Sequence, residues 1–272
     1  MPVAAPYYAL RVLVLLPPSE AKARDGVRRG APVDLRSLSG RELTAAREHV
    51  LGRLIETSGS PDALRRLGVG ATLAGEVENN TRLRQAPARR VSDLYTGVLY
   101  AALGLPDLPS AARVRAARQL LVVSALWGAL RVHDRVPAYR LSMGADLAGL
   151  GPLAAFWRPR LGPVLARAAG QGIVVDCLSG AYRAAWRPSP ELAERTLAVR
   201  VVREQGGQQR AVSHLAKLTR GQVVRHLLLR PGSPPRSPAA AEAAVREAFE
   251  CQLVRGRGSW RLDVSVRETS SH

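Results

Sequence analysis

Several features are scarce in this 272-residue chain, and each scarcity argues against a class of protein. Its two cysteines have no paired or metal-like spacing, which gives no support to a disulfide scaffold or a zinc site. No stretch approaches the ~20 apolar residues of a membrane span. The apolar run at 12–16 is too short for a good signal-peptide core. These absences predict a cytoplasmic protein without a membrane partner.

Common enzyme motifs are also missing. The chain has no G-x-x-x-x-G-K-[ST], no G-x-S-x-G and no H-E-x-x-H, so phosphate-loop, hydrolase-elbow and zinc-protease sites have no local support. The histidines lack paired metal-ligand spacing with carboxylates. We therefore predict neither a metal nor a cofactor.

Lysine is nearly absent, although positive charge is abundant. The chain has 40 Lys and Arg against 22 Asp and Glu, a formal net charge of +18, yet only Lys22 and Lys217 are lysines. Such an excess attracts polyanions, so nucleic acid is the leading partner class. The alternative is that many arginines only solvate the surface. Because lysine offers a compact charge and a pKa that burial can lower, these two positions are candidates for a role that arginine cannot fill.

Apolar runs and helical periodicities are interspersed along the chain. Strands are expected at 11–16, near the end of 116–126, at 172–178, as a hairpin from 196–203 and 210–214, and as a pair around 256–259. Helices are expected at 40–58, from 61 to 67–70, at 92–104 with Ser92 as N-cap, at 153–170, at 216–229 and up to about 249. We predict an α+β fold, a single compact domain over 1–272 with a mixed β-sheet surrounded by helices. Residues 1–10 would be an N-terminal extension, residues 266–272 a disordered tail, and the protein a monomer.

The stretch LGVG, 67–70, lies between two predicted helices. A helix, a hydrophobic-Gly-hydrophobic-Gly turn and a further helix resemble the helix-hairpin-helix motif, whose turn amides contact DNA phosphates without reading sequence. Gly68 and Gly70 would form that turn. A plain glycine cap at the end of the first helix explains the same four residues at least as well.

Separate motifs in a fixed order resemble the YaaA family of peroxide stress proteins, from about Arg11 to about Arg261. The matching residues are Pro18, Ser19 and Lys22; Tyr95 and Gly97; Ser124, Trp127, Gly128, Leu130, Arg131 and Asp134; Tyr139, Arg140, Leu141, Met143 and Gly144; Phe156 and Trp157; Ser179 and Tyr182; and Ser213, Lys217, Arg220 and Gly221. Three positions depart from the family pattern: Ser142 replaces a glutamate, Ala181 replaces an acidic residue, and Asp176 stands near an expected asparagine. If relatives use a carboxylate at 142 or 181, this chain cannot.

The resemblance implies a positively charged cleft, DNA binding, and a role in limiting oxidative, iron-driven damage. Because the histidines lack metal-ligand spacing, we expect any effect on iron to be indirect. Binding would have little sequence preference and a steep salt dependence. The candidate nucleic-acid-binding residues are Lys22, Arg131, Arg135, Tyr139, Arg140, Lys217, Arg220, Gly68 and Gly70. Stacking on exposed bases would fall to Tyr139, Trp127 or Tyr182. We expect Tyr139 and Arg140 to face the cleft, with Leu141 and Met143 packed beneath it.

Two other interpretations stay open. The first is an enzyme that acts on a nucleobase, nucleotide or nucleic acid with a cleft lysine as base or nucleophile. Its catalytic candidates are Ser19, Lys22, Asp134, Tyr139 and Lys217. The second is purely structural, with Asp134 pairing with Arg131 or Arg140 and Tyr139 donating to a backbone carbonyl. It explains single residues well, but clustered like charges repel one another when no anion is present.

Overall fold

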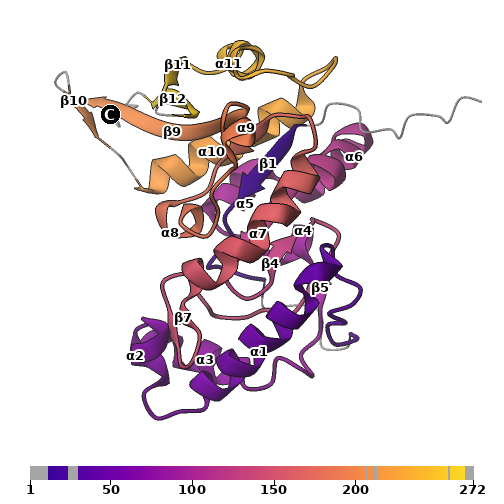
Figure 1. Ribbon diagram of the computed structural model, residues 1–272, viewed down its shortest axis with the longest axis vertical. Helices are drawn as coiled ribbons and strands as arrows, with labels where there is room; N and C mark the ends of the chain where they lie inside the picture. Colours follow the sequence, from indigo (N-terminus) through magenta and orange to yellow (C-terminus); the bar gives the residue numbers. More distant parts are fainter. Residues whose placement is uncertain (1–11, 24–29, 206–207, 211–212, 257, 267–272) are drawn as a thin grey trace, which may run out of the picture.

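The fold is organised by one mixed β-sheet (Figure 1). Over the part of the chain that the structure describes, the strand order is β11-β12-β9-β8-β1-β3-β4, with β10 paired to the end of β9. The strand bounds are β1 Leu13–Leu16, β3 Leu120–Ser124, β4 Gly128–Leu130, β8 Val174–Asp176, β9 Thr196–Gln205, β10 Gln208–Arg210, β11 Cys251–Arg255 and β12 Trp260–Val266. Neighbours from β12 to β3 pair in parallel, whereas β4, β10 and β11 pair antiparallel.

This computed structural model describes residues 12–23, 30–205, 208–210, 213–256 and 258–266. The predicted N-terminal extension lies outside the described residues, as do residues 267–272 of the tail predicted at 266–272; Val266, the first residue of that predicted tail, is the last residue of β12. Also outside them are residues 206–207 of the predicted hairpin turn, residues 211–212 of its predicted second strand at 210–214, and residue 257 between the last two strands. The end of that predicted strand is wrong, because a helix begins at Ser213.

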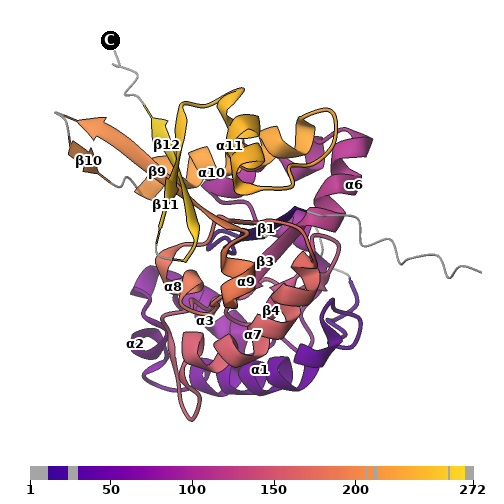
Figure 2. The ribbon, with the colours of Figure 1, turned by 45° about the horizontal axis from the view of Figure 1, so that its top comes forward.

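Helices cover the sheet and extend the molecule beyond it. Their bounds are α1 Thr44–Ser58, α2 Ala63–Leu67, α3 Ala74–Asn80, α4 Val91–Leu94, α5 Val98–Leu103, α6 Ser110–Gln119, α7 Leu153–Ala169, α8 Gly180–Arg183, α9 Pro190–Ala193, α10 Ser213–Leu229 and α11 Pro238–Arg246, with 3-10 turns η1 Arg41–Leu43, η2 Ala71–Leu73 and η3 Leu105–Asp107. Two small ribbons pair β2 (Arg89–Arg90) with β5 (Arg135–Val136) and β6 (Asp146–Leu147) with β7 (Gly151–Pro152). Figures 1 and 2 both place α1, α2 and α3 at the end of the molecule opposite α11.

The prediction of one domain with a mixed sheet surrounded by helices agrees with the structure, but the architecture is α/β rather than α+β. Consecutive parallel strands are separated by helical segments: α1 to α6 between β1 and β3, and α7 before β8. Parallel neighbours far apart in the sequence leave no local turn signal, so their pairing was not predictable from the chain. The apolar strand β1 is fully buried between β3 and β8.

The parallel strands place their carboxyl ends at one edge of the sheet, where open α/β sheets commonly bind ligands. The loop with Ser19 and Lys22 follows β1, Ser124 ends β3, and Tyr182 follows β8. The fold therefore brings three motifs that are distant in the sequence to the same edge.

The predicted helix at 92–104 is interrupted, so this prediction was wrong in detail. Helix α4 ends at Leu94 and α5 starts at Val98, with Tyr95 in an extended conformation between them. The backbone of Lys22 forms a β-bridge with Tyr95. The residue before α4 is Arg90, so Ser92 lies inside the helix and is not its N-cap.

Helix α2 ends where the sequence predicts. Gly68 has a left-handed conformation, φ 64°, at the C-cap of α2, which is the glycine-cap interpretation of LGVG. Gly70 is extended and precedes η2. A helix-hairpin-helix function of this turn stays a prediction. No helix among the described residues is long and apolar enough to cross a membrane.

Candidate functional site

A cavity of about 1560 Å³ opens beside the loop that follows β1. We name it the lysine cavity because both lysines of the chain line it, Lys22 from that loop and Lys217 from α10. The remaining wall comes from α3 and the segments on either side of it between residues 72 and 89, from the start of α5, from residues 138–140 and from Ser179 and Tyr182. Among the described residues, the charged side chains of its lining are Lys22, Arg82, Arg89, Arg140, Lys217, Arg220, Glu20, Glu76 and Glu78.

The cavity unites most of the residues that the sequence singles out. Those that line it are Ser19, Lys22, Tyr139, Arg140, Tyr182, Lys217 and Arg220. Tyr139 and Arg140 both border the cavity as expected, while Leu141 and Met143 are buried in the core. Tyr139 is itself only 4% exposed, so it forms the floor of the cavity and offers little surface for stacking on a base.

Lys22 is held at the cavity wall by its own loop. Its Nζ donates to the carbonyl oxygens of Ser19 at 2.9 Å and Glu20 at 3.4 Å. The ring of Tyr139 lies 4.3 Å from Nζ, a cation–π distance when the amine is charged. Burial is the main cause that lowers the pKa of the Lys22 ammonium and the Arg140 guanidinium is the second; Glu76 and Glu20 oppose the shift, and the resulting pKa is about 7. Lys22 is therefore poised between its charged and neutral forms at neutral pH.

The break between α4 and α5 fixes the loop that carries Lys22. The Gly97 amide donates to Ser19 Oγ at 2.8 Å, and the Ala23 amide donates to the carbonyl of Leu94. A Cβ added at Gly97 would overlap Ser19 Oγ. Ser19 is thus engaged in positioning the loop, and glycine at 97 is required by its close approach.

A chain of buried hydroxyls lies under Lys22. Ser124 Oγ accepts the amides of Leu126 and Trp127, which leaves its proton for Tyr139 Oη at 2.7 Å. Tyr139 Oη lies 3.0 Å from Tyr95 Oη. Burial raises the pKa of both tyrosines well above the ordinary value, so both are neutral phenols. The expectation that Tyr139 donates to a backbone carbonyl was wrong, because hydroxyl partners occupy that role.

Arg140 is oriented by two residues of α3. Its Nε donates to Glu76 Oε2 at 2.7 Å, and Nη2 lies 2.5 Å from the same oxygen. The side-chain amide of Asn80 accepts from the Arg140 amide and donates to the Arg140 carbonyl, each at 2.9 Å. Ser142 leaves the Tyr-Arg motif without a carboxylate of its own, and the carboxylate that contacts Arg140 is Glu76.

Helix α10 contributes the other lysine. Lys217 is exposed at the cavity, and Arg220 Nε donates to the carbonyl of Val199. The helix lies against α5, and a Cβ added at Gly221 would overlap the carbonyl oxygen of Leu99. Glycine at 221 therefore allows α10 to approach α5 closely and sets where Lys217 stands.

Six predicted site residues lie elsewhere: Gly68 and Gly70 in the turn after α2, and Trp127, Arg131, Asp134 and Arg135. Asp134 is buried, and its carboxylate accepts the amides of Ser39 and Arg131 and the Ser39 hydroxyl. This matches the structural interpretation of Asp134, although its partner in Arg131 is the backbone and not the guanidinium. Arg135 is exposed and donates to the carbonyl of Ala88. Trp127 is fully buried, which contradicts its proposed stacking on a base.

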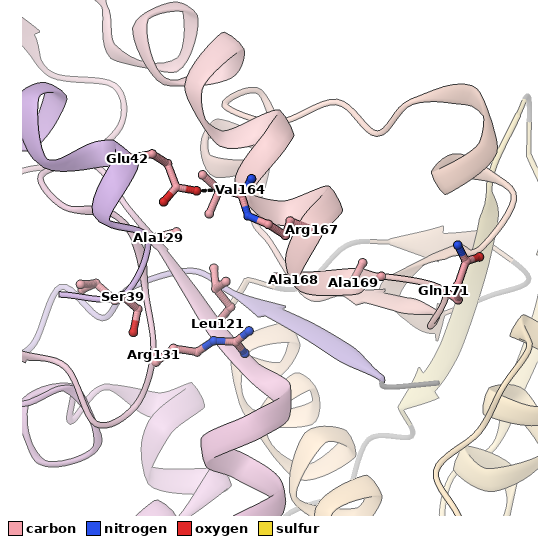
Figure 3. Close-up of a pocket in the computed structure, with 13 residues that line it drawn as sticks. Ser39, Glu42, Leu121, Ala129, Arg131, Val164, Arg167, Ala168, Ala169 and Gln171 are labelled. Carbon is pink, nitrogen blue, oxygen red and sulfur yellow. Dashed lines mark ion pairs between the residues drawn. The ribbon is translucent and has the colours of Figure 1, made fainter. Parts of the chain in front are cut away.

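Arg131 borders a second, smaller cavity of about 310 Å³ (Figure 3). Its Nη1 donates to the carbonyls of Arg118 and Leu120. Across the same cavity, Glu42 and Arg167 form an ion pair. The charged groups of this cavity are therefore already engaged with protein partners.

Sequence reasoning missed Arg47, which is completely buried. Its guanidinium donates to four carbonyl oxygens: those of Ser39, Gly40, Trp127 and Ala129. Burial lowers the pKa of Arg47 to about 10, an effect that Asp134 opposes. Arg47 thus ties α1 to the turn after Ser124, and that turn supports Tyr139.

The described residues offer no metal centre. There, no group of three or more His, Cys, Asp or Glu side chains could hold a metal ion. Both cysteines are buried, and burial raises the pKa of both thiols.

Comparison with known proteins gives one consistent result. A family model described as "Peroxide stress protein YaaA" matches residues 12–236. A UPF0246 protein of Streptomyces coelicolor is 49% identical over 263 residues, which covers 94% of this chain and 99% of the relative. A UPF0246 protein of Corynebacterium efficiens is 35% identical over 249 residues, covering 90% of this chain and 97% of the relative.

Proposed function

The chain belongs to the YaaA family of peroxide stress proteins, and we propose that it binds nucleic acid, in particular DNA, through the lysine cavity without sequence preference. One observation carries the proposal: the only two lysines of the chain line the same cavity together with Arg220. Clustered cations repel one another unless an anion joins them. The arrangement therefore favours a phosphate-bearing ligand.

The charges of the cavity differ in how far they are already neutralised. Arg140 is paired with Glu76, and Arg82 lies 3.5 Å from Glu78. By contrast, Lys22, Lys217 and Arg220 form no ion pair among the described residues. Lys22 and Arg220 donate to backbone carbonyls, and Lys22 also lies over the Tyr139 ring. Lys217 and Arg220, with the protonated fraction of Lys22, would carry most of the attraction for phosphate.

The size and surroundings of the cavity suit a polymer better than a small metabolite. Pockets for small ligands have volumes of about 300–1,000 Å³, and the lysine cavity is larger, at about 1560 Å³. The formal net charge of +18 would steer a polyanion toward the protein at long range. Bound DNA would be shielded where it enters the cavity, which fits a role in limiting oxidative damage.

Salt-dependent binding tests the proposal. Fluorescence anisotropy of a labelled random-sequence duplex is measured between low and physiological salt for the wild type, Lys217→Ala and Arg113→Ala. Phosphate contacts from Lys217, Arg220 and the protonated fraction of Lys22 predict a slope of log K against log salt of about −2 to −3, and loss of one phosphate contact reduces the magnitude of the slope by about 1. The matched control removes exposed Arg113 on α6, outside the lysine cavity.

We expect Lys217→Ala to weaken binding and flatten the slope, and Arg113→Ala to leave the slope near that of the wild type. A salt-independent wild type that is folded by circular dichroism would refute nucleic-acid binding. Equal effects of the two substitutions would show that general charge, and not the lysine cavity, provides the attraction.

A second candidate function, catalysis on a nucleobase, nucleotide or nucleic acid, is favoured by the environment of Lys22. An amine that burial and Arg140 keep partly neutral serves as a base or a nucleophile at neutral pH. Treated nucleotides analysed by mass spectrometry, with wild type and Lys22→Ala compared, would reveal a product that depends on this amine.

A further inference from the structure

The Lys22 amine has hydrogen-bond acceptors for two N–H groups, the carbonyl oxygens of Ser19 and Glu20. In the part of the chain that the structure describes, Nζ has no carboxylate partner and donates only to the carbonyls of Ser19 and Glu20. A neutral amine has two N–H groups and one lone pair. The two carbonyls take both N–H groups, and the lone pair stays available on a side chain that borders the cavity.

The surroundings favour the neutral amine. Burial is the main cause that lowers the pKa of Lys22 to about 7, and the Arg140 guanidinium is the second. The charged and titratable groups around Nζ are Glu20, Glu76, Arg140, Tyr95 and Tyr139. Glu76 and Glu20 oppose this shift, but Glu76 is already paired with Arg140, both tyrosines are neutral, and burial and Arg140 outweigh the two glutamates.

We propose that Lys22 forms an imine with an aldehyde that is flanked by phosphates, as in the ring-opened sugar of an abasic site in DNA. This inference rests on the proposed binding of nucleic acid and names the feature of the nucleic acid that the cavity recognises. The aldehyde supplies the electrophile, and the flanking phosphates supply the charge that α10 would bind.

The reaction balances without a metal or a redox partner. The Nζ lone pair attacks the aldehyde carbon and forms the C–N bond, and one amine proton moves to the carbonyl oxygen to give a carbinolamine. The second amine proton then leaves with the hydroxyl as water, and the C=N bond replaces the C–O bond. Hydrolysis reverses both steps, so the adduct is covalent but exchangeable.

The positions of the two lysines suit different roles, phosphate binding for Lys217 and imine formation for Lys22. Lys217 is exposed on α10 at the cavity, next to Arg220 one turn away, and both suit phosphates on either side of a damaged sugar. Lys22 lies in the wall above the Tyr139 ring, where only a group that enters the cavity reaches it. One lysine would therefore hold the backbone and the other would react.

Borohydride trapping tests this inference, because it reduces an imine to a stable secondary amine. The full chain is incubated with a duplex that contains one abasic site, with the same duplex intact, or with free 2-deoxyribose 5-phosphate, and is then reduced. Peptide mapping by mass spectrometry locates the adduct among the lysines and the N-terminal amine. Anisotropy of the same duplexes is measured in parallel, and Lys22→Arg, Lys22→Met and Arg113→Ala are compared with the wild type.

We expect an adduct at Lys22 with the abasic duplex, loss of that adduct in Lys22→Arg and Lys22→Met, neither of which supplies a primary amine at this position, and wild-type yield in Arg113→Ala. The yield should rise with pH through about 7. Binding without an adduct, or an adduct only at Lys217 or the N-terminus, would overturn the imine and leave nucleic-acid binding intact. An adduct with the free sugar phosphate alone would refute a nucleic-acid source for the aldehyde. No binding to either duplex would refute the proposed function itself.

Discussion

Replacing Lys22 by methionine should change how the stability of the protein depends on pH. The folded chain holds this amine with a pKa of about 7, against 10.5 for an ordinary lysine. Between these values the unfolded chain binds more protons than the folded chain, so the free energy of unfolding of the wild type rises with pH across that window. Below about pH 7 both states are protonated and the full cost of burying the charge remains.

The size of the effect follows from the shift. Each pKa unit is worth about 1.4 kcal/mol, so a shift from 10.5 to about 7 gives at most about 5 kcal/mol between pH 7 and pH 10.5. The side chain is only half-buried, and solvent reduces this figure. We therefore expect the free energy of unfolding of the wild type to rise by about 2–4 kcal/mol more than that of Lys22→Met between pH 7 and pH 10.5.

Urea denaturation followed by circular dichroism at several values between pH 6.5 and pH 10.5 measures this difference, because the midpoint and slope give the free energy of unfolding. Titration of other groups is common to both proteins and cancels in the comparison. Lys217→Met removes the same charge from an exposed position and should retain the pH dependence of the wild type. Parallel profiles for the wild type and Lys22→Met would refute the claim that burial keeps Lys22 partly neutral.

Two further substitutions test the packing around the site. Gly221→Ala should destabilise the protein by about 2–3 kcal/mol, because the added Cβ would overlap the Leu99 carbonyl oxygen and push α10 from α5. Thermal melting measures the loss, and an unchanged melting temperature would contradict the close approach. Arg47→Leu should cost about 3 kcal/mol or more, since it leaves four buried carbonyls without their donor. Urea denaturation measures that loss, and a cost under about 1 kcal/mol would show that the carbonyls find other partners.

Many of the helices and strands follow from local sequence patterns, but the order of the strands in the sheet does not. The apolar run at 11–16 and the periodicity at 153–170 both give the correct elements, β1 and α7. Parallel pairing of β1 with β3 depends on helices that intervene over a hundred residues, and no local residue encodes it. Local sequence patterns therefore could not distinguish an α+β fold from an α/β fold.

The interruption of the helix at 92–104 shows a tertiary contact overriding a local preference. Residues 92–104 have a helical pattern, but the Lys22 loop pairs with Tyr95 and opens the helix. Gly97 was the available signal, because a glycine within a helical pattern often marks a close approach. Its amide contacts Ser19 Oγ in the structure.

The site residues that belong to sequence motifs were predictable, whereas those placed by tertiary packing were not. Lys22, Tyr139 and Lys217 meet in one cavity, as the pairing of rare lysines with matched motifs suggested. Arg47 lies three residues before Val50 and four after Leu43, on the apolar face of α1, so a charge on that face was a usable sign of a buried role. The sequence did not predict that Glu76 and Asn80 orient Arg140, because these contacts join segments about sixty residues apart.

One half-buried lysine and one exposed lysine line the same cavity, so the two side chains can serve as spectroscopic probes of that cavity. Growth with lysine carrying carbon-13 at its ε position would give two ε-methylene signals, one for each of Lys22 and Lys217. The first signal would follow protonation inside the cavity and the second would follow events at its mouth. A single spectrum would then distinguish a ligand that only touches the rim from one that enters.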